Sequence, residues 1–149
     1  MNIIFVCTGN TCRSPMAEGF MKKLTSDDKT DYKISSRGIA VMGNTPASEN
    51  SVLASAEYGV DISSHVSSQL SGDDVKNADI IVTVTQNHAE LIKTAFPEYA
   101  QKVHSASEIT GEPGISDPYG GSLEIYKKCA GQIMDLCRIL YEKIRSENQ

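Results

Sequence analysis

The chain has 149 residues, of which 40% are hydrophobic, and 19 acidic and 14 basic side chains give a formal net charge of −5 at pH 7. This length suits one domain with a substantial core, and we expect a single domain over residues 1–149. The acidic balance argues against a general nucleic-acid-binding surface. The sequence contains neither an apolar run of about 18 residues nor a signal-peptide pattern, so we expect a cytoplasmic protein without membrane contacts.

The expected elements alternate between strands and helices, with β-branched runs for strands and apolar residues three or four positions apart for helices. In chain order we expect a strand at 3–6, a helix at 15–24, a strand at 32–36, a helix from Pro46 (capped by Thr45) to about Gly59, a helical turn near 71–74, a strand at 78–84, a helix from Thr85 or Asn87 to Pro97, a strand at 102–105 and a helix at 122–145. This alternation favours an α/β fold, a doubly wound parallel sheet with helices on both faces. A strand order of 2-1-3-4 would place a ligand site beyond the first strand.

A loop from a cysteine to an arginine follows the first expected strand. It reads Cys-Thr-Gly-Asn-Thr-Cys-Arg-Ser over residues 7–14, and Ser14 and Pro15 are typical of a helix N-cap and a first helical residue. A loop that turns into a helix N-terminus points backbone N–H groups at a bound oxyanion, and Arg13 adds a fork that matches phosphate. The same positive field favours the thiolate form of Cys7.

A cysteine at a strand end is, taken alone, usually a small buried apolar residue. The combination with the arginine, the preceding strand and the helix start predicts instead a phosphate-binding loop with Cys7 as the nucleophile. The residues expected to hold phosphate are Thr8, Gly9, Asn10, Thr11, Cys12, Arg13 and Ser14.

The remaining cysteines do not indicate a metal site. Cys12, Cys129 and Cys137 have spacings that do not match the closely paired ligands of zinc, so we expect no metal and mostly structural thiols. A Gly- and Pro-rich segment at 111–121 carries Asp117 and is a candidate functional loop. An aspartate before a proline in such a loop is by itself commonly a turn residue.

Together these motifs resemble the low-molecular-weight protein-tyrosine-phosphatase family over nearly the whole chain. The family pattern of Cys, five residues, Arg and Ser is present at 7–14, its downstream Asp-Pro pair at 117–118, and residues 59–65 resemble its middle section. The resemblance implies a four-stranded, doubly wound domain without metal or organic cofactor. It also implies that Cys7 forms a phosphocysteine intermediate, that Arg13 holds the phosphoryl oxygens, and that Asp117 protonates the leaving group and then activates water.

The resemblance further assigns a polar network that holds the loop in shape, formed by Asn10, Ser14, Ser36 and His65. Ser14 is also placed to donate to the Cys7 sulfur. Cys12 either forms a reversible disulfide with Cys7 that protects it from over-oxidation or packs behind the loop, and both options stay open. The implied partners are phosphorylated protein substrates and inorganic phosphate or other oxyanions, and we expect a monomer.

Thr11 and Tyr119 bear on the substrate. Phosphotyrosine phosphatases of this type usually carry a bulky aliphatic residue at the position of Thr11, whereas members that hydrolyse protein phosphoarginine have threonine and an Asp-Pro-aromatic-Gly-Gly-Ser segment, as at 117–122 here. A threonine hydroxyl can meet a guanidinium whose N–H groups an isoleucine would leave unpaired. Tyr119 can stack on either group. We therefore expect a protein-arginine phosphatase, with phosphotyrosine phosphatase as the alternative.

Two other classes fit the sequence less well. Arsenate reductases on this fold need a further cysteine pair near the middle of the chain, and residues 80–91 contain no cysteine. A non-catalytic phosphoprotein-binding module would keep the arginine loop but lose Cys7 or Asp117, and both are present.

Overall fold

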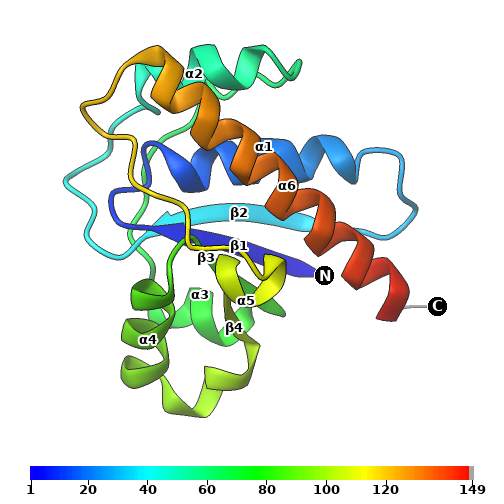
Figure 1. Cartoon of the computed structure of the whole chain (residues 1–149). Coiled ribbons are helices and arrows are strands. Elements are labelled where there is room, and N and C mark those ends of the chain that lie inside the picture. Colours follow the sequence, from blue (N-terminus) through cyan, green and yellow to red (C-terminus); the bar gives the residue numbers. More distant parts are fainter. Residues whose placement is uncertain (148–149) are drawn as a thin grey trace.

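Four parallel strands form the centre of the computed structural model, which describes residues 1–147 (Figure 1). They are β1 (Asn2–Cys7), β2 (Lys33–Gly38), β3 (Ile80–Thr83) and β4 (Val103–Ser105). Their order is β2-β1-β3-β4, which confirms the order expected from the sequence. Because the strands are parallel, their carboxyl ends meet at one edge of the sheet, and Cys7, opposite Gly38 of β2, is the last residue of β1.

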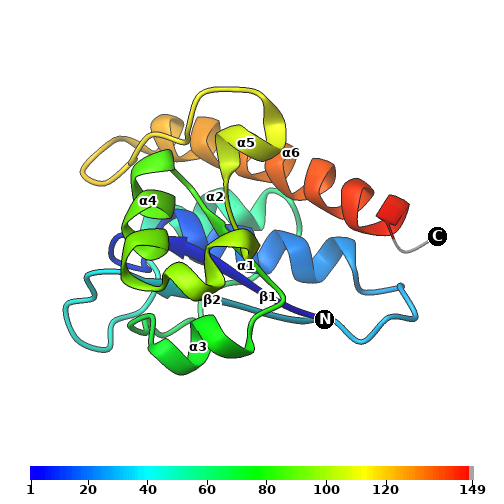
Figure 2. The same cartoon turned by 90° about the horizontal axis from the view of Figure 1, so that it is seen from below.

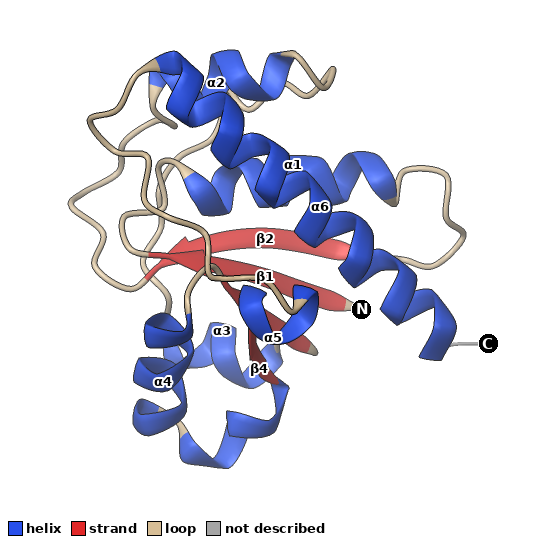
Figure 3. Ribbon diagram, in the orientation of Figure 1, coloured by secondary structure: helices blue, strands red, loops and turns tan. Residues whose placement is uncertain are grey.

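Helices cover both faces of the sheet (Figures 2 and 3). They are α1 (Arg13–Leu24), α2 (Glu49–Ala56), α3 (Gly72–Asn77), α4 (Gln86–Ala95), α5 (Ala106–Thr110) and α6 (Leu123–Glu147), with a 3₁₀ helix η1 (Pro97–Lys102) after α4. Helices α1, α2, α5 and α6 share one apolar core with the sheet, whereas α3 and α4 build the core on the other face.

The central strand β1 is buried on both faces, which explains why its own sequence is a continuous run of apolar residues. Ile3 and Phe5 are buried in the core with α1 and α6, whereas Ile4 and Val6 are buried in the core with α3 and α4. A parallel strand covered on both faces needs apolar side chains at every position. This burial fixes β1 in the middle of the sheet and so fixes the place of Cys7.

Two expected helix starts were wrong. Helix α1 begins at Arg13 with Cys12 in the cap position, so Ser14 is not the N-cap but lies inside the helix, where its hydroxyl contacts Cys7 Sγ. Helix α2 begins at Glu49 and is capped by Ser48, because Pro46 instead pairs with Val66 in a short antiparallel bridge. In both places the residue expected at the helix start makes a contact with a distant segment instead.

The remaining differences concern short elements. The expected turn near 71–74 is the capping box of α3, while η1 and α5 were not expected because they are too short to show a period. Strand β3 is shorter than expected, ending at Thr83. Among residues 1–147, no helix has both the length and the apolar character needed to cross a bilayer.

Candidate active site

The carboxyl edge of the sheet carries a pocket of about 410 Å³. Its lining comes from within residues 7–13, 40–45 and 117–119, and Figure 1 shows these loops gathered at the left end of the sheet. Five of the residues predicted to hold phosphate line this pocket, namely Thr8, Gly9, Thr11, Cys12 and Arg13. The other two, Asn10 and Ser14, are fully buried.

The carbonyl groups of the loop point outward into the surrounding chain. They accept hydrogen bonds as follows: Cys7 from Ile39 N–H at 3.0 Å, Thr8 from Ala40 N–H at 3.0 Å, Asn10 from His65 Nε2 at 2.8 Å and Thr11 from Ser48 N–H at 2.9 Å. In a planar trans peptide the N–H points opposite to the carbonyl. Each outward carbonyl therefore turns the next N–H toward the inside of the loop, which makes a cradle for an anion.

Asn10 holds the loop in its curved shape. Its φ of 58° is in the left-handed region, which asparagine tolerates better than most residues. Its side-chain amide donates to Ser14 Oγ at 2.8 Å and to Ser36 Oγ at 3.0 Å, and its Oδ1 accepts from Ser68 N–H at 2.9 Å. With His65 on the Asn10 carbonyl, the structure brings together all four residues of the expected supporting network.

Cys7 lines the pocket and is buried. Its Sγ is 2.9 Å from Ser14 Oγ. Because Ser14 Oγ already accepts from Asn10, its proton is available to the sulfur or to the Arg37 carbonyl, which is farther away at 3.4 Å. Ser14 therefore lies where it can donate to a sulfur anion.

Arg13, the first residue of α1, and Asp117, in the loop before α6, both line the pocket. Arg13 is only 4% exposed, and its guanidinium donates to the Ile115 carbonyl at 2.8 Å. Its Nη2 lies 3.9 Å from Asp117 Oδ2, and the Asp117 side chain is 56% exposed at the rim. Asp117 Oδ1 accepts from Tyr119 N–H at 3.0 Å, while the Tyr119 ring is exposed at the mouth. The Ile115 N–H donates to the Val84 carbonyl and ties this loop to the end of β3.

Cys12 is a buried free thiol. Its Sγ lies 3.4 Å from Ser48 Oγ and 3.5 Å from Tyr126 Oη, two residues that the sequence did not single out. Burial, followed by the contact with Cys12, raises the pKa of Tyr126 to about 12. Burial likewise raises the pKa of Cys129 to about 12, which fits a structural thiol on α6.

His88 is the main residue of this edge that was not predicted from the sequence. It lies in the first turn of α4, is 6% exposed, and its Nε2 is 2.9 Å from Thr8 Oγ1. Burial lowers the pKa of His88, Arg13 acts in the same direction, and Asp117 opposes them. The position of His88 near Cys7 could have been predicted from the sequence. A helix that follows the parallel strand beside β1 must begin at the edge of the sheet where Cys7 lies.

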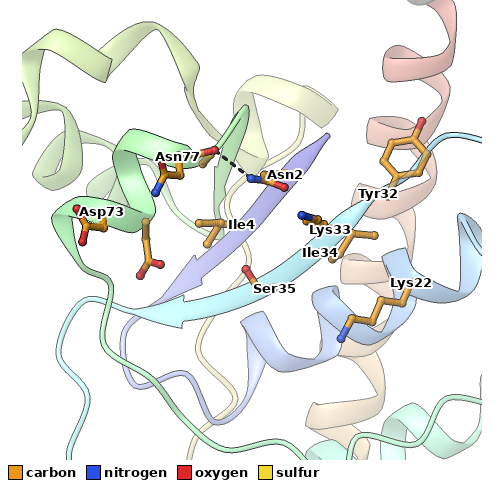
Figure 4. A pocket seen from close by; sticks show the side chains of 11 residues that line it. Asn2, Ile4, Lys22, Tyr32, Lys33, Ile34, Ser35, Asp73 and Asn77 are labelled. Atoms are coloured by element: carbon orange, nitrogen blue, oxygen red, sulfur yellow. Dashed lines mark hydrogen bonds between the residues drawn. The ribbon is translucent and has the colours of Figure 1, made fainter.

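A second hollow, of about 470 Å³, lies toward the amino ends of β1 and β2 (Figure 4). Asn2 and Asn77, joined by a hydrogen bond of 3.1 Å, contribute to its lining, together with Lys22, Lys33 and Asp73. Its described lining includes neither cysteine nor histidine. Among residues 1–147, no group of three or more His, Cys, Asp and Glu side chains is placed to hold a metal ion.

A doubly wound sheet with a Cys-to-Arg cradle after β1 and an aspartate loop over it defines a class of small cysteine-dependent phosphatases. The chain belongs to the low molecular weight phosphotyrosine protein phosphatase family, whose model matches residues 2–149. The expectation from the sequence is thereby confirmed.

Individual relatives carry two different activity names. A protein-arginine-phosphatase of Bacillus subtilis is 36% identical, with both chains covered in full, and a low molecular weight protein-tyrosine-phosphatase of Staphylococcus haemolyticus is also 36% identical, covering 91% of this chain and 94% of its own. Among solved structures, a mutant of the YwlE arginine phosphatase with a phosphorylated active-site serine is similar with a TM-score of 0.91 and 35% identity, covering 97% of this chain and 96% of its own. A low molecular weight protein tyrosine phosphatase from T. tengcongensis gives 0.90 and 40%, with coverage of 96% and 99%.

Proposed function

We propose that this protein is a protein-arginine phosphatase that cleaves the P–N bond of phosphoarginine in proteins through a phosphocysteine intermediate. The observation that carries the proposal is the presence of Thr11 in the lining of the pocket beside Cys7 and Arg13. Overall identity does not separate the two activities, because relatives of both names are 36% identical to this chain. The family match over residues 2–149 supports a single phosphatase domain for residues 1–149.

Thr11 offers a polar group where a planar guanidinium would enter. Its Oγ1 lies 3.7 Å from Cys12 Sγ, a weak contact that leaves the hydroxyl available to a substrate. An isoleucine in its place would leave guanidinium N–H groups without a partner, and an unpaired buried donor costs about 1–3 kcal/mol. The Thr11 hydroxyl therefore favours phosphoarginine over phosphotyrosine.

In the first chemical step, the Cys7 thiolate attacks phosphorus, the S–P bond forms and the P–N bond breaks. The inward N–H groups of residues 8–14 and the Arg13 guanidinium hold the equatorial oxygens, where charge is spread in the transition state. Asp117 gives its proton to the departing nitrogen. The geometry supports this role of Asp117, because Tyr119 N–H donates to its Oδ1 while its Oδ2 lies 3.9 Å from Arg13 Nη2.

In the second step, water attacks the phosphocysteine, the S–P bond breaks and inorganic phosphate leaves. The Asp117 carboxylate takes a proton from the water, and the Cys7 thiolate is restored. Ser14, at 2.9 Å from the sulfur, stabilises the thiolate as it departs. The solved mutant of an arginine phosphatase with a phosphorylated active-site serine supports a covalent intermediate at this position.

Phosphotyrosine hydrolysis is the second candidate. The exposed side chains of Met42 and Tyr119 form an apolar rim that also suits a phenyl ring. The relative from Staphylococcus haemolyticus named as a tyrosine phosphatase supports this alternative.

The discriminating experiment compares kcat/KM for matched phosphoarginine and phosphotyrosine peptides in the wild type and in Thr11→Ile. We expect the wild type to prefer phosphoarginine and Thr11→Ile to lose that preference. Thr30→Ile, in the exposed turn after α1, is the matched control and leaves both values unchanged. A wild type that prefers phosphotyrosine, with no effect of Thr11→Ile, would contradict the arginine assignment.

We further propose that the protein acts on phosphorylated proteins as a monomer in the cytoplasm and that its loop also binds inorganic phosphate. The four free thiols support a reducing compartment. Whether Cys7 and Cys12 form a reversible disulfide stays a prediction, which a thiol-reversible loss of activity after peroxide treatment tests.

A further inference from the structure

We propose that His88 is a positioning residue of the phosphatase site: its Nε2–H donates to Thr8 Oγ1 and turns the Thr8 hydroxyl proton toward the pocket, where it donates to a phosphoryl oxygen. This inference rests on the proposed function, since it requires a phosphoryl group in the cradle.

The geometry places His88 between a capping threonine and the loop. His88 Nε2 is 2.9 Å from Thr8 Oγ1, and its Nδ1 is 2.7 Å from Thr85 Oγ1. The ring is almost fully buried, so both nitrogens depend on protein partners. The contact joins two segments 80 residues apart in the sequence, the loop after β1 and the first turn of α4.

The donors and acceptors around the His88 ring favour one tautomer of the ring. Thr85 is the N-cap of α4, and its Oγ1 already accepts the backbone N–H of His88 at 3.3 Å. A proton on Nδ1 would make Thr85 Oγ1 accept a second N–H and leave its own hydroxyl proton to find another acceptor. When Thr85 donates to Nδ1 instead, every group is paired and the ring proton is on Nε2.

This tautomer decides what Thr8 offers to the pocket. Thr8 Oγ1 accepts from Nε2–H, so its own proton remains free to donate. Thr8 is exposed, lines the pocket beside Cys7, and its carbonyl is fixed by Ala40 N–H at 3.0 Å. The unprotonated oxygens of a phosphoryl group only accept hydrogen bonds, so a Thr8 hydroxyl that donates matches them. In the other tautomer, Nε2 would be an acceptor and the Thr8 hydroxyl would donate to it instead of to the pocket.

The charge state of the ring agrees with this arrangement. Burial and the nearby Arg13 lower the pKa of His88, with Asp117 opposing, which favours the neutral ring. A neutral ring keeps Nδ1 as the acceptor for Thr85. Protonation of Nδ1 would turn it into a donor and end its role as the acceptor for Thr85, whereas Nε2–H would still donate to Thr8.

A double-mutant cycle tests the relay. His88→Asn retains an amide that reaches toward Thr85 but not Thr8, whereas the longer amide of His88→Gln can still donate to Thr8. We expect His88→Asn and Thr8→Val each to lower kcat/KM for an aryl phosphate, and to weaken the binding of inorganic phosphate, by about tenfold, the size of one lost hydrogen bond to a charged group. The double variant loses no more than either single variant, and His88→Gln retains most of the activity.

Two controls separate positioning from folding. His104→Asn, on β4 and paired with Glu108 away from the pocket, leaves activity and phosphate binding unchanged. Thermal unfolding of each variant shows whether the fold is retained. A loss in His88→Asn that persists undiminished in the Thr8→Val background, or an equal loss in His88→Gln, would overturn the relay.

The failure of the proposed function has a different signature. A wild type that hydrolyses neither aryl phosphate nor phosphopeptides contradicts the phosphatase assignment. The phosphate-binding arm of the cycle, measured by calorimetry with inorganic phosphate, still decides whether His88 acts through Thr8.

Discussion

The two ends of the parallel sheet carry hollows of similar volume, about 410 Å³ at the carboxyl edge and about 470 Å³ toward the amino ends, but their chemistry differs. At the carboxyl edge, peptide groups turned inward by outer hydrogen bonds surround a buried cysteine and a buried arginine. Toward the amino ends, the charged groups are exposed side chains such as Lys22, Lys33 and Asp73. Volume therefore does not identify the site. The site is identified by fixed, buried hydrogen-bond donors, because such donors need no reorganisation when charge develops in the transition state.

Removal of the Cys7 sulfur at the carboxyl edge should lower activity more than any other change. Cys7→Ser is expected to lower kcat by about 10⁴-fold or more, because a serine hydroxyl is not ionised as a thiolate is. Binding of inorganic phosphate and the melting temperature stay close to those of the wild type, since the cradle is made by backbone groups and Arg13. Lys33→Ala in the amino-end hollow leaves kcat/KM unchanged, and a fully active Cys7→Ser variant contradicts the scheme.

The next effect concerns the proton donor. Asp117→Asn is expected to lower kcat by about 10²- to 10⁴-fold, the usual value of acid–base assistance, while the inhibition constant of inorganic phosphate changes less. Glu112→Gln, an exposed acidic residue of the same loop, is the matched control and has no such effect. Equal effects of both substitutions would mean that loop charge, and not Asp117, matters.

Gly38, at the end of β2, packs closely against the loop that starts at Cys7, and adding a side chain there should have a smaller effect. A Cβ on Gly38 would lie 2.5 Å from the Thr8 carbonyl oxygen and 2.7 Å from Val41 Cγ2, so the backbone of the loop must shift. Gly38→Ala is therefore expected to lower the free energy of unfolding by about 1–3 kcal/mol and to reduce phosphate binding, as measured by urea unfolding and calorimetry.

Gly72→Ala, at the start of α3, provides the comparison at a glycine outside the Cys7–Ser14 loop. A Cβ there would meet Phe96 at an ordinary 3.6 Å, so stability and phosphate binding should hardly change. If Gly38→Ala behaves in the same way, the loop is less rigid than its outer hydrogen bonds indicate.

The smallest effect is a pH dependence of stability. The pKa of His88 is lowered in the folded protein, so below about pH 6.5 the unfolded chain binds more protons than the folded one. The free energy of unfolding should therefore fall as the pH falls from about 7 toward the folded pKa, and it should fall less in His88→Gln. Denaturant titrations at several pH values measure this. His104→Gln is the control, and a matching pH dependence in wild type and His88→Gln would be against the assignment.

The sequence predicted the parts of the site that depend on local pattern. The strand before Cys7, the arginine six residues later and the Asp117 loop all follow from adjacent residues, and the rule that a ligand lies where the strand order switches led to the sheet order. The structure brings Cys7, Arg13 and Asp117 to one pocket, as the interpretation requires.

The parts that the sequence did not predict depend on contacts between distant segments. Serine is a residue type that is preferred at a helix N-cap, but the Ser14 hydroxyl contacts Cys7 and Asn10 instead. His88 resembles an ordinary helix residue until α4 is packed beside the loop, and the carbonyl of Ile115 carries no side-chain signal at all. Propensity and spacing describe local preference, whereas these contacts arise only when the fold closes.

We propose that Thr11, within the cradle of Cys7 and Arg13, makes this family member act on phosphoarginine. The most direct measurement is the ratio of kcat/KM for a phosphoarginine peptide to that for a phosphotyrosine peptide of the same sequence context. The ratio is expected to exceed one in the wild type and to fall below one in Thr11→Ile. A wild-type ratio below one that Thr11→Ile leaves unchanged would contradict the claim.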